Sequence, residues 1–449
     1  MKNTVLSLSA LLLSTGLLVS GNTFLMTLLG VRMSLEQVDS GIIGWVLVCY
    51  SLGFVIGTLY CPRIIERVGH IRSFAVFCAL MGMACLLHPV WVHPLPWAML
   101  RGAVGISMAG LLLIIESWFS TRATNENRGT LFAVYQVLFY LTAAGGQLLV
   151  SMGNPGTFMP FSIAALFLIA ALVPLALTRL EAPAIEQTER LSFRELYKIS
   201  PLGLLAAMVS GVVTSAFNNL APVYGYQINL DVQEIALFMS TTVLAAMAFA
   251  WPLGRISDLF DRRLVMLILA LIAAVSSLAT ALFGQANLFA LFLSAQLFIG
   301  IAAAIYPIAV AVTNDKLHSH QIVAASAGLL LSYGVGSCIG PILGSGMVSA
   351  VGPDGLFFAT TGVLVALSLY TLWFIQHSKR VPIQVQETFV QTMPISTPIL
   401  AELDPRNEEF TEMPSPDIGP DEPLAEEAGR GAADSAEQDP PERHAPPGT

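Results

Sequence analysis

Twelve long apolar segments run through the chain, and they constrain its fold more than any other feature. Each holds about 20 mostly apolar residues, enough for a helix rising 1.5 Å per residue to cross a hydrocarbon core about 30 Å thick. Charged residues make up 11% of the chain, against about 25% in soluble domains. The sequence therefore predicts an all-α membrane protein with twelve transmembrane helices. Their expected positions are 5–30, 41–62, 73–91, 96–118, 130–151, 158–178, 202–224, 234–254, 264–284, 287–312, 323–349 and 355–377.

The first apolar segment lies close to the N-terminus and invites comparison with a cleavable signal peptide. It runs for about 24 residues, whereas the apolar region of a signal peptide has about 7–15. We therefore expect it to remain in the protein as the first transmembrane helix.

The positive charges fall on one side of this twelve-helix arrangement. Sixteen of the Lys and Arg residues lie in connections on the side that holds both termini, and Arg32 lies on the other. By the positive-inside rule this places both termini in the cytoplasm, and we expect a multi-pass protein of the bacterial inner membrane.

The acidity of the chain belongs to its C-terminal part. Residues 1–380 carry 18 Lys and Arg and 15 Asp and Glu, whereas residues 381–449 carry 3 and 15. The C-terminal stretch is rich in Pro, Glu, Asp and Ser, so we expect a disordered acidic tail. The expected divisions are a six-helix bundle at 1–178, a central cytoplasmic loop at 179–201, a second bundle at 202–380 and the tail at 381–449.

Motifs of other functional classes are missing from the sequence. The five cysteines show no metal-ligand spacing, and no basic stripe suggests nucleic-acid binding. No phosphate-binding loop, zinc helix or nucleophile elbow is present. We expect no bound metal or cofactor, no nucleic-acid partner and no enzymatic activity.

A charged motif follows the eighth segment, and a second copy follows the second segment. Residues 254–263 read GRISDLFDRR and resemble the cytoplasmic signature G-x-L-A-D-R-x-G-R-R of the major facilitator superfamily, with Asp261 in place of the second glycine. Residues 62–72 read PRIIERVGHIR, 192 positions earlier, with Glu66 matching Asp258. The repeat at equivalent loops strengthens the resemblance.

Three further motifs support the resemblance. Residues 101–105 read RGAVG, like the Arg-x-x-x-Gly element of the family, and glycines recur at 145–146 and 334–344. Simple helix packing and a special antiport role explain these glycines about equally well. Glu116 opens the phrase ESWF, which is similar to the YcaD-like branch.

The resemblance covers residues 1–380 and implies a fold of two six-helix bundles related by a parallel repeat. It also implies that Glu66 and Asp258 approach the starts of the eleventh and fifth helices, and that Arg67, Arg262 and Arg263 pair with Glu116 or Asp315 when the cytoplasmic side closes. We interpret these residues as a gate latch, and simple topological anchoring is the alternative. The gate and coupling set is Glu66, Arg67, Glu116, Gly254, Asp258, Arg262, Arg263 and Asp315.

Arg101 is the one clear cation inside a predicted span. An arginine in hydrocarbon costs about 2.5–3.5 kcal/mol, so it should face a cavity or a partner. Binding of an anionic substrate group or a part in proton coupling is one interpretation, and reaching out to the periplasmic surface is the other. Glu116 and Asp315, at corresponding cytoplasmic helix ends, are alternative protonatable groups.

By the same resemblance, helices one, four, seven and ten line the central cavity, with contributions from two, five, eight and eleven. Polar or aromatic residues on these helices are the candidate substrate contacts, although hydrogen bonds between helices explain any single one about as well. They are Asn22, Thr23, Tyr50, Tyr135, Gln136, Tyr140, Asn218, Asn219, Tyr224, Trp251, Gln296, Tyr306 and Tyr333.

The sequence thus favours a monomeric secondary transporter that moves a small neutral or anionic organic solute by alternating access, coupled to protons, in a direction that the sequence leaves open. The alternative is a transporter-like membrane sensor that signals through its acidic tail.

Overall fold

The computed structural model describes residues 2–123, 127–178, 193–317 and 321–378, with Gln386, Phe389 and Thr392, and it describes side chains from Leu8 onward. All of these residues belong to one compact unit, residues 1–408, and the second unit, 409–449, contains no described residue. The predicted tail, apart from those three positions, lies outside the described residues. So does most of the predicted central loop.

The prediction of twelve transmembrane helices is confirmed, since twelve helices among the described residues are long and apolar enough to cross a membrane. The first bundle contains α1 (Lys2–Leu35), α2 (Ser40–Val68), α3 (His70–Leu87), α4 (Pro94–Arg122), α5 (Arg128–Leu148), the short 3₁₀ helix η1 (Leu149–Met152), α6 (Met159–Ala170) and α7 (Leu172–Ala176). The second contains α9 (Pro201–Gln227), α10 (Val232–Leu259), α11 (Arg262–Phe283), α12 (Leu288–Asn314), α13 (Ile322–Val351) and α14 (Gly355–His377).

Two short helices refine the predicted boundaries. The sixth span consists of α6 and α7, separated at Ala171. Pro174 explains the break, because a proline has no N–H to donate to the carbonyl four residues earlier, and its ring clashes there. The predicted central loop contains one helical segment, α8 (Phe193–Ile199), directly before α9.

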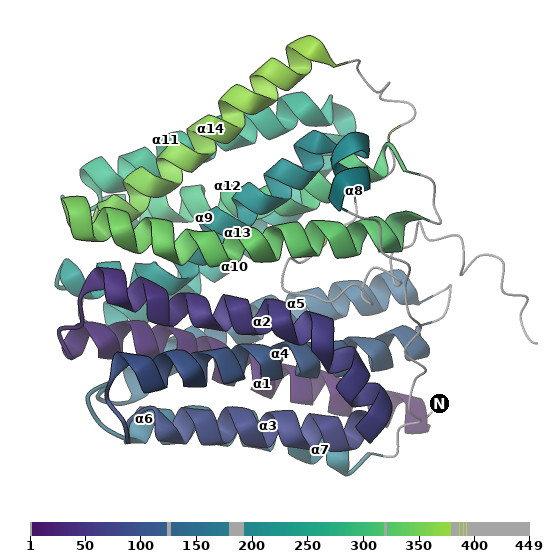
Figure 1. Cartoon of the computed structure of the whole chain (residues 1–449), viewed down its shortest axis with the longest axis vertical. Helices are drawn as coiled ribbons and strands as arrows, with labels where there is room; N and C mark the ends of the chain where they lie inside the picture. The colour runs from purple at the N-terminus through teal and green to yellow at the C-terminus, as the bar shows by residue number, and fades with distance from the viewer. Residues whose placement is uncertain are drawn as a thin grey trace, which may run out of the picture. The chain divides into compact units, whose positions relative to one another are not determined.

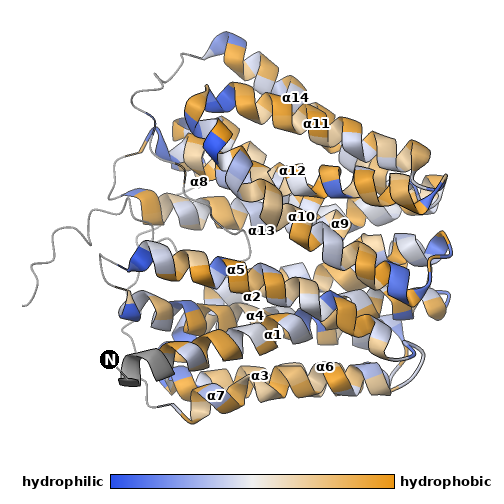
Figure 2. Cartoon of the chain, turned by 180° about the vertical axis from the view of Figure 1, so that it is seen from behind, coloured by the Kyte–Doolittle hydropathy of each residue, from blue (hydrophilic) through white to orange (hydrophobic). Residues whose placement is uncertain are grey.

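Consecutive transmembrane helices run in opposite directions, so their connections gather at two ends. We call the end with the N-terminus and the two charged loops the motif end, at the right of Figure 1. The other is the far end. Orange apolar residues cover the helices between these ends in Figure 2. Large apolar side chains such as Trp45 and Leu369 are more than half exposed, as expected of a surface that faces lipid.

Close helix pairs organise each bundle. On α4, a Cβ atom added to Gly105 would overlap the backbone of Tyr50 on α2. In the second bundle, a Cβ atom on Gly336 of α13 would overlap the backbone of Met208 on α9. Glycine thus allows the two backbones of each pair to touch, which is how helices associate without a hydrophobic driving force. Gly105 of the 101–105 motif and Gly336 of the 334–344 motif therefore both have a packing role.

Side-chain contacts between the bundles occur at the far end. Gly30 of α1 lies against Pro222 of α9, and Gly44 of α2 lies against Ser345 of α13. The Gln227 amide donates a hydrogen bond to the Ser40 hydroxyl at 3.0 Å. These contacts join the two bundles at the far end.

Candidate functional site

A buried cation on α4 lies over an aromatic ring of α2. The guanidinium carbon of Arg101 lies 4.6 Å from the centre of the Tyr50 ring, and the arginine is fully buried. Its position follows from the local sequence, because Gly105, one turn later, brings α4 against the backbone of Tyr50. A desolvated cation–π contact of this kind contributes about 2 kcal/mol.

Arg101 nevertheless has unmet hydrogen-bonding capacity. Among the described residues, no acceptor reaches its Nε, Nη1 or Nη2 atoms. Nearby, the Asn22 amide donates to the Tyr50 hydroxyl at 3.3 Å, while the Asn22 Oδ1 atom has no partner within the described part of the chain. The complete burial of Arg101 does not fit the alternative of a side chain that reaches out to the membrane surface. Five unused N–H donors on a fixed planar cation suit a carboxylate, phosphate or sulfonate group.

The second bundle contains a neutral polar cluster. The hydroxyl groups of Thr214 and Tyr333 share a hydrogen bond of 2.7 Å, and the Tyr306 ring lies edge-on to that of Tyr333, with 5.4 Å between ring centres. Further along α9, the amide of Asn219 donates to the backbone oxygen of Ser215 at 2.9 Å. These groups offer hydroxyl and aromatic surfaces but no charge.

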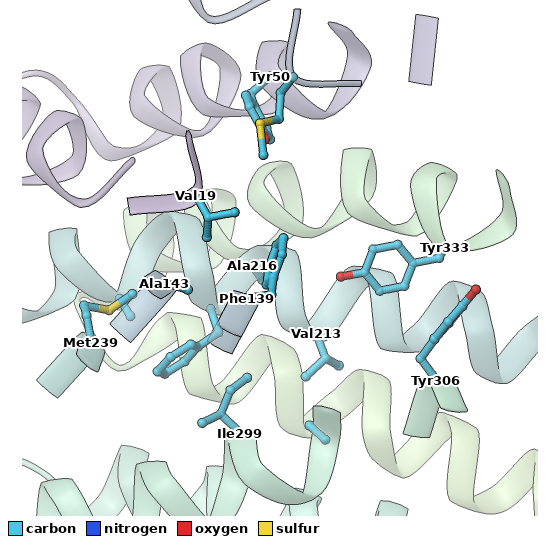
Figure 3. Packing of buried hydrophobic residues seen from close by; sticks show 14 of the residues in the cluster. Val19, Tyr50, Phe139, Ala143, Val213, Ala216, Met239, Ile299, Tyr306 and Tyr333 are labelled. Carbon is cyan, nitrogen blue, oxygen red and sulfur yellow. The ribbon is translucent and has the colours of Figure 1, made fainter. Parts of the chain in front are cut away.

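Aromatic residues of these two clusters lie around one apolar region. Figure 3 shows Tyr50 from the first bundle and Tyr306 and Tyr333 from the second near apolar side chains of both bundles. Those labelled are Val19, Phe139, Ala143, Val213, Ala216, Met239 and Ile299.

The structure gathers only some of the predicted cavity residues. Asn22, Tyr50 and Arg101 make one cluster, while Asn219 and Tyr306 belong to the second bundle's polar region. The other residues occupy separate places. Gln136 and Tyr224 are buried, Tyr140, Asn218 and Gln296 are half-buried, and Trp251 is mostly exposed beneath Arg255.

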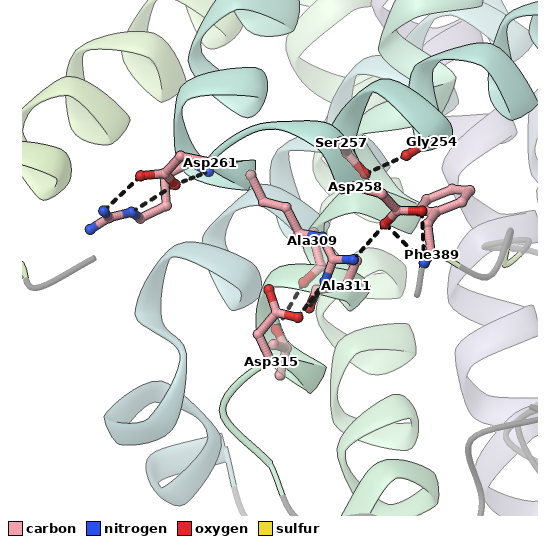
Figure 4. A network of polar contacts seen from close by, with 11 residues as sticks. Gly254, Ser257, Asp258, Asp261, Ala309, Ala311, Asp315 and Phe389 are labelled. Atoms are coloured by element: carbon pink, nitrogen blue, oxygen red, sulfur yellow. Dashed lines mark hydrogen bonds and ion pairs between the residues drawn. The ribbon is translucent and has the colours of Figure 1, made fainter. Parts of the chain in front are cut away.

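A buried charge network occupies the motif end of the second bundle (Figure 4). Arg262, with a side chain 1% exposed, pairs with Asp315 after α12 and with Asp258 one turn earlier, the latter at 2.8 Å. It also donates to the backbone oxygen of Ala311. The motif therefore ties α10 and α11 to the end of α12. At the same end, burial lowers the pKa of the Lys316 amine and nearby Arg263 lowers it further, with Asp315 acting in the opposite direction.

The departure at Asp261 from the family signature has a structural reason. Its carboxylate caps α11 by accepting the Arg263 backbone N–H at 3.0 Å, and it also pairs with the Arg263 guanidinium at 2.8 Å. In the first copy, Gly69 has φ = 93°, a conformation that favours glycine. The two loops turn differently, and each has the residue that its turn requires.

The first copy of the motif lacks the ion-pair arrangement of the second. His70 occupies the position of Arg262 and lies against the Trp118 ring, with 5.6 Å between ring centres. Among the described residues, neither Glu66 nor Arg67 makes an ion pair. Glu116 is fully buried and accepts a hydrogen bond from the Tyr135 hydroxyl at 3.0 Å.

Among the described residues, no hydrogen bond or ion pair joins Asp258 to the start of α5, and the predicted approach of the two stays a prediction. Asp258 accepts a hydrogen bond from the Arg262 guanidinium. It also accepts from the backbone N–H of Phe389, which lies 3.0 Å from Oδ1 and 3.2 Å from Oδ2.

Sequence reasoning missed Phe389, although it is one of very few aromatic residues in the tail. It also missed Thr214, which hydroxyls spaced four residues apart at Ser210 and Thr214 would have indicated.

Comparisons with known proteins agree with this fold. The family model of the Major Facilitator Superfamily matches residues 11–228 and 203–403. The chain is 28% identical over 382 residues to a protein of Escherichia coli described as the uncharacterized MFS-type transporter YcaD, covering 84% of this chain and 96% of that protein. A protein of the same name from Salmonella newport is 28% identical over 344 residues, covering 76% of this chain and 87% of that one.

Solved structures share the fold at lower identity. A bacterial homologue of the human lysosomal transporter Spinster, inward-facing and occupied, has a TM-score of 0.71 at 15% identity, over 87% of this chain and 100% of that one. The nucleoside transporter NupG has a TM-score of 0.69 at 15% identity, over 84% and 100%. The D-xylose-proton symporter has a TM-score of 0.63 at 16% identity, over 86% and 99%.

Proposed function

Because the chain belongs to the Major Facilitator Superfamily, we propose that it is a secondary active transporter that moves a small organic anion across the membrane by alternating access. Its relatives are transporters and not enzymes. The anionic character of the solute, the coupling to protons, the monomeric state and the membrane orientation are parts of the same proposal.

The single observation that carries the choice of an anion is that the N–H donors of Arg101 meet no acceptor among the described residues. A buried arginine is normally paired or hydrogen-bonded, because leaving its donors unmet forfeits the hydration that they had in water. Here the Tyr50 ring covers one face, while the Nε and Nη donors remain open. A carboxylate, phosphate or sulfonate would satisfy two donors at once in the geometry that arginine favours.

The packing between the bundles supports alternating access. Contacts such as Gly44 with Ser345 close the far end, and rocking one bundle against the other is how such repeats expose a site to each side in turn. The buried network around Arg262 lies at the opposite end. We therefore assign this network to the gate of the motif end.

Glu116 is our proposed proton-coupling group. Among the Asp and Glu residues that the structure describes, Glu116 is the one that is fully buried within a transmembrane helix. Its hydrogen-bond partner Tyr135 belongs to a different helix. When a carboxylate inside a membrane helix gains or loses a proton, the charge of an apolar region changes, so the contacts around that carboxylate respond strongly. Replacing Glu116 with Gln in proteoliposomes should abolish uptake driven by a pH gradient while leaving solute exchange at equal pH. Loss of both, or of neither, would count against this assignment.

The orientation proposal places both termini and the motif end in the cytoplasm, where the sixteen clustered cations of the sequence would lie. Labelling of a cysteine at exposed Leu264 should then require a membrane-permeant reagent in intact bacterial cells. Equal labelling by an impermeant reagent would contradict this orientation and place the motif end outside the cytoplasm.

The test of anion transport is a thermal-shift screen of the purified protein against organic carboxylates, phosphates, sulfonates and neutral solutes. The matched variants are Arg101→Met and Arg32→Met, because Arg32 is also a buried arginine of a transmembrane helix but is paired with Glu36. We expect anions to stabilise the wild type and the Arg32 variant and to leave the Arg101 variant unshifted.

A hit from that screen is then tested for movement across proteoliposomes by counterflow, with neutral solutes as controls. Stabilisation by neutral solutes alone, or equal anion shifts in both variants, would contradict the proposal.

A further inference from the structure

A residue of the C-terminal tail binds the charged motif of α10. The backbone N–H of Phe389 points at the Asp258 carboxylate, 3.0 Å from Oδ1 and 3.2 Å from Oδ2, and the Phe389 ring lies beside Gly254 (Figure 4). Phe389 follows the end of α14 at His377 by 12 residues. The Phe389 ring and the Phe389 backbone N–H of the acidic tail thus both contact the charged motif at 254–263.

The α10 surface accommodates both groups together. Gly254 and Asp258 are four residues apart, so they lie one above the other on the same face of the helix. A Cβ atom added to Gly254 would overlap three atoms of the Phe389 ring. The Phe389 ring therefore occupies space that only a glycine at position 254 leaves open. The Phe389 backbone N–H donates to the Asp258 carboxylate one helical turn further along α10.

Two other described tail residues are half-buried. The side-chain oxygens of Gln386 and Thr392, three positions before and after Phe389, are buried from solvent. Phe389 itself packs against the apolar core.

The contact also reaches the ion-pair network. Asp258 binds Arg262, and Arg262 binds Asp315 at the end of α12. The Phe389 amide is therefore a direct member of the network that joins α10, α11 and the end of α12 at the motif end.

We propose that Phe389 is an internal ligand of the surface formed by Gly254 and Asp258, and that through this residue the tail acts as an autoinhibitory strap. This inference rests on the proposed alternating access. Closing the motif end by alternating access would bring the end of α10 closer to the first bundle, in which α5 is the main contact partner of α10. With Phe389 seated on Gly254, that face of α10 is occupied, so the strap favours the state in which the motif end is open.

The docking itself is tested by disulfide cross-linking in the full chain, with the five native cysteines replaced. Arg255→Cys, beside Gly254 on α10, is combined with Val390→Cys, beside Phe389, so that Gly254 and the Phe389 ring are both kept. This Phe389 pair is compared with pairs that use Ile383→Cys and Ser396→Cys on either side. A flexible tether predicts rates that change steadily with distance along the tail. Docking predicts that the Phe389 pair reacts at least about tenfold faster than both neighbours. A steady trend through the three positions would overturn the docking.

The restraint is tested by spin-label distances across the motif end. Labels at Gly129→Cys on α5 and Leu264→Cys on α11 are suitable, because both positions are exposed. Phe389→Ala should raise the ratio of short to long distances by about tenfold, the change that corresponds to about 1.4 kcal/mol. Gly254→Ala should have the same effect by blocking the ring, and the double variant should add nothing further. Phe410→Ala, which removes another tail phenylalanine, is the matched control.

The outcomes separate the strap from the transport proposal. A fast Phe389 cross-link with unchanged distances in Phe389→Ala would show a docked tail without a restraint and would overturn the strap. One fixed distance in every variant, with or without a stabilising anion, would contradict alternating access itself. The cross-linking rates report on docking in either case.

Discussion

The guanidinium of Arg101 lies 4.6 Å above the Tyr50 ring, and no acceptor among the described residues reaches its nitrogens. The ring compensates part of the cost of burying the charge but satisfies none of the N–H donors. The site is therefore destabilised until a ligand arrives. Transporters need such a site, since a binding group already satisfied by the protein contributes little affinity for a solute.

Replacing Arg101 with Met should stabilise the ligand-free protein and abolish its response to anions. Relief of a cost of about 2.5–3.5 kcal/mol exceeds the loss of about 2 kcal/mol of cation–π attraction, so we expect a net gain of about 1 kcal/mol. Thermal unfolding with and without the identified anion measures both effects. Tyr50→Phe is the control, since it keeps the ring and should retain the anion response. A less stable Arg101→Met variant that still responds to anions would contradict our interpretation.

The adjacent glycines of α5 should respond in opposite ways to alanine. A Cβ atom on Gly146 would overlap Thr23 and Ser20 of α1, whereas one on Gly145 meets nothing within 4 Å. Gly146→Ala should destabilise the protein by about 1–3 kcal/mol through overpacking. Gly145→Ala should stabilise it by up to about 1 kcal/mol because alanine is the better helix former. Equilibrium unfolding in mixed micelles compares the two, and equal effects would contradict the close approach of α1 and α5 at Gly146.

Breaking the buried ion pair of the motif end should be costly. The side chains of Arg262 and Asp315 are 1% and 4% exposed, so Asp315→Asn leaves the buried Arg262 with Asp258 as its charged partner and should cost about 1–3 kcal/mol. The control is Glu36→Gln, which breaks the more exposed Arg32–Glu36 pair and should cost no more than about 1 kcal/mol. Combining Asp315→Leu with Arg262→Met should recover much of the loss. Similar unfolding midpoints for Asp315→Asn and Glu36→Gln would show that the network contributes little.

The hydrogen bond between Thr214 and Tyr333 should be visible as a coupling energy. Tyr333→Phe and Thr214→Val each remove the 2.7 Å contact while keeping most of the side-chain volume. We expect each to cost about 0.5–1.5 kcal/mol and the double variant to cost less than their sum. A double-mutant cycle on unfolding free energies measures this, with Thr142→Val as the single-site control on α5. Strict additivity would mean that the two hydroxyls do not interact.

Much of the fold could be predicted because hydropathy is a local property. Each span is recognised from its own apolar residues, and the charged connections fix where spans end. The break at Ala171 was missed although Pro174 is visible in the sequence, since a proline in a span is often tolerated when neighbours satisfy the freed carbonyl. The copy of the charged motif at Gly254 was recognisable for the same reason, since its residues are contiguous in the chain.

The partners of the candidate site residues depended on the tertiary structure. Arg101 was identifiable as an unusual cation, but its position over Tyr50 depends on how closely α2 and α4 approach. Likewise, nothing in residues 62–72 indicated that His70 would meet Trp118 where the second copy has an ion pair. Such contacts depend on helix rotation and tilt, which hydropathy does not specify.

The sequence by itself therefore determined twelve apolar helices, their connections and the two copies of a charged motif, because each is encoded by neighbouring residues. The tertiary structure alone decided which donors remain open around Arg101 and that Asp258 binds the Phe389 amide. The physical reason is distance along the chain. Asp258 and Phe389 are 131 residues apart, and only folding brings the carboxylate within hydrogen-bonding distance of that amide.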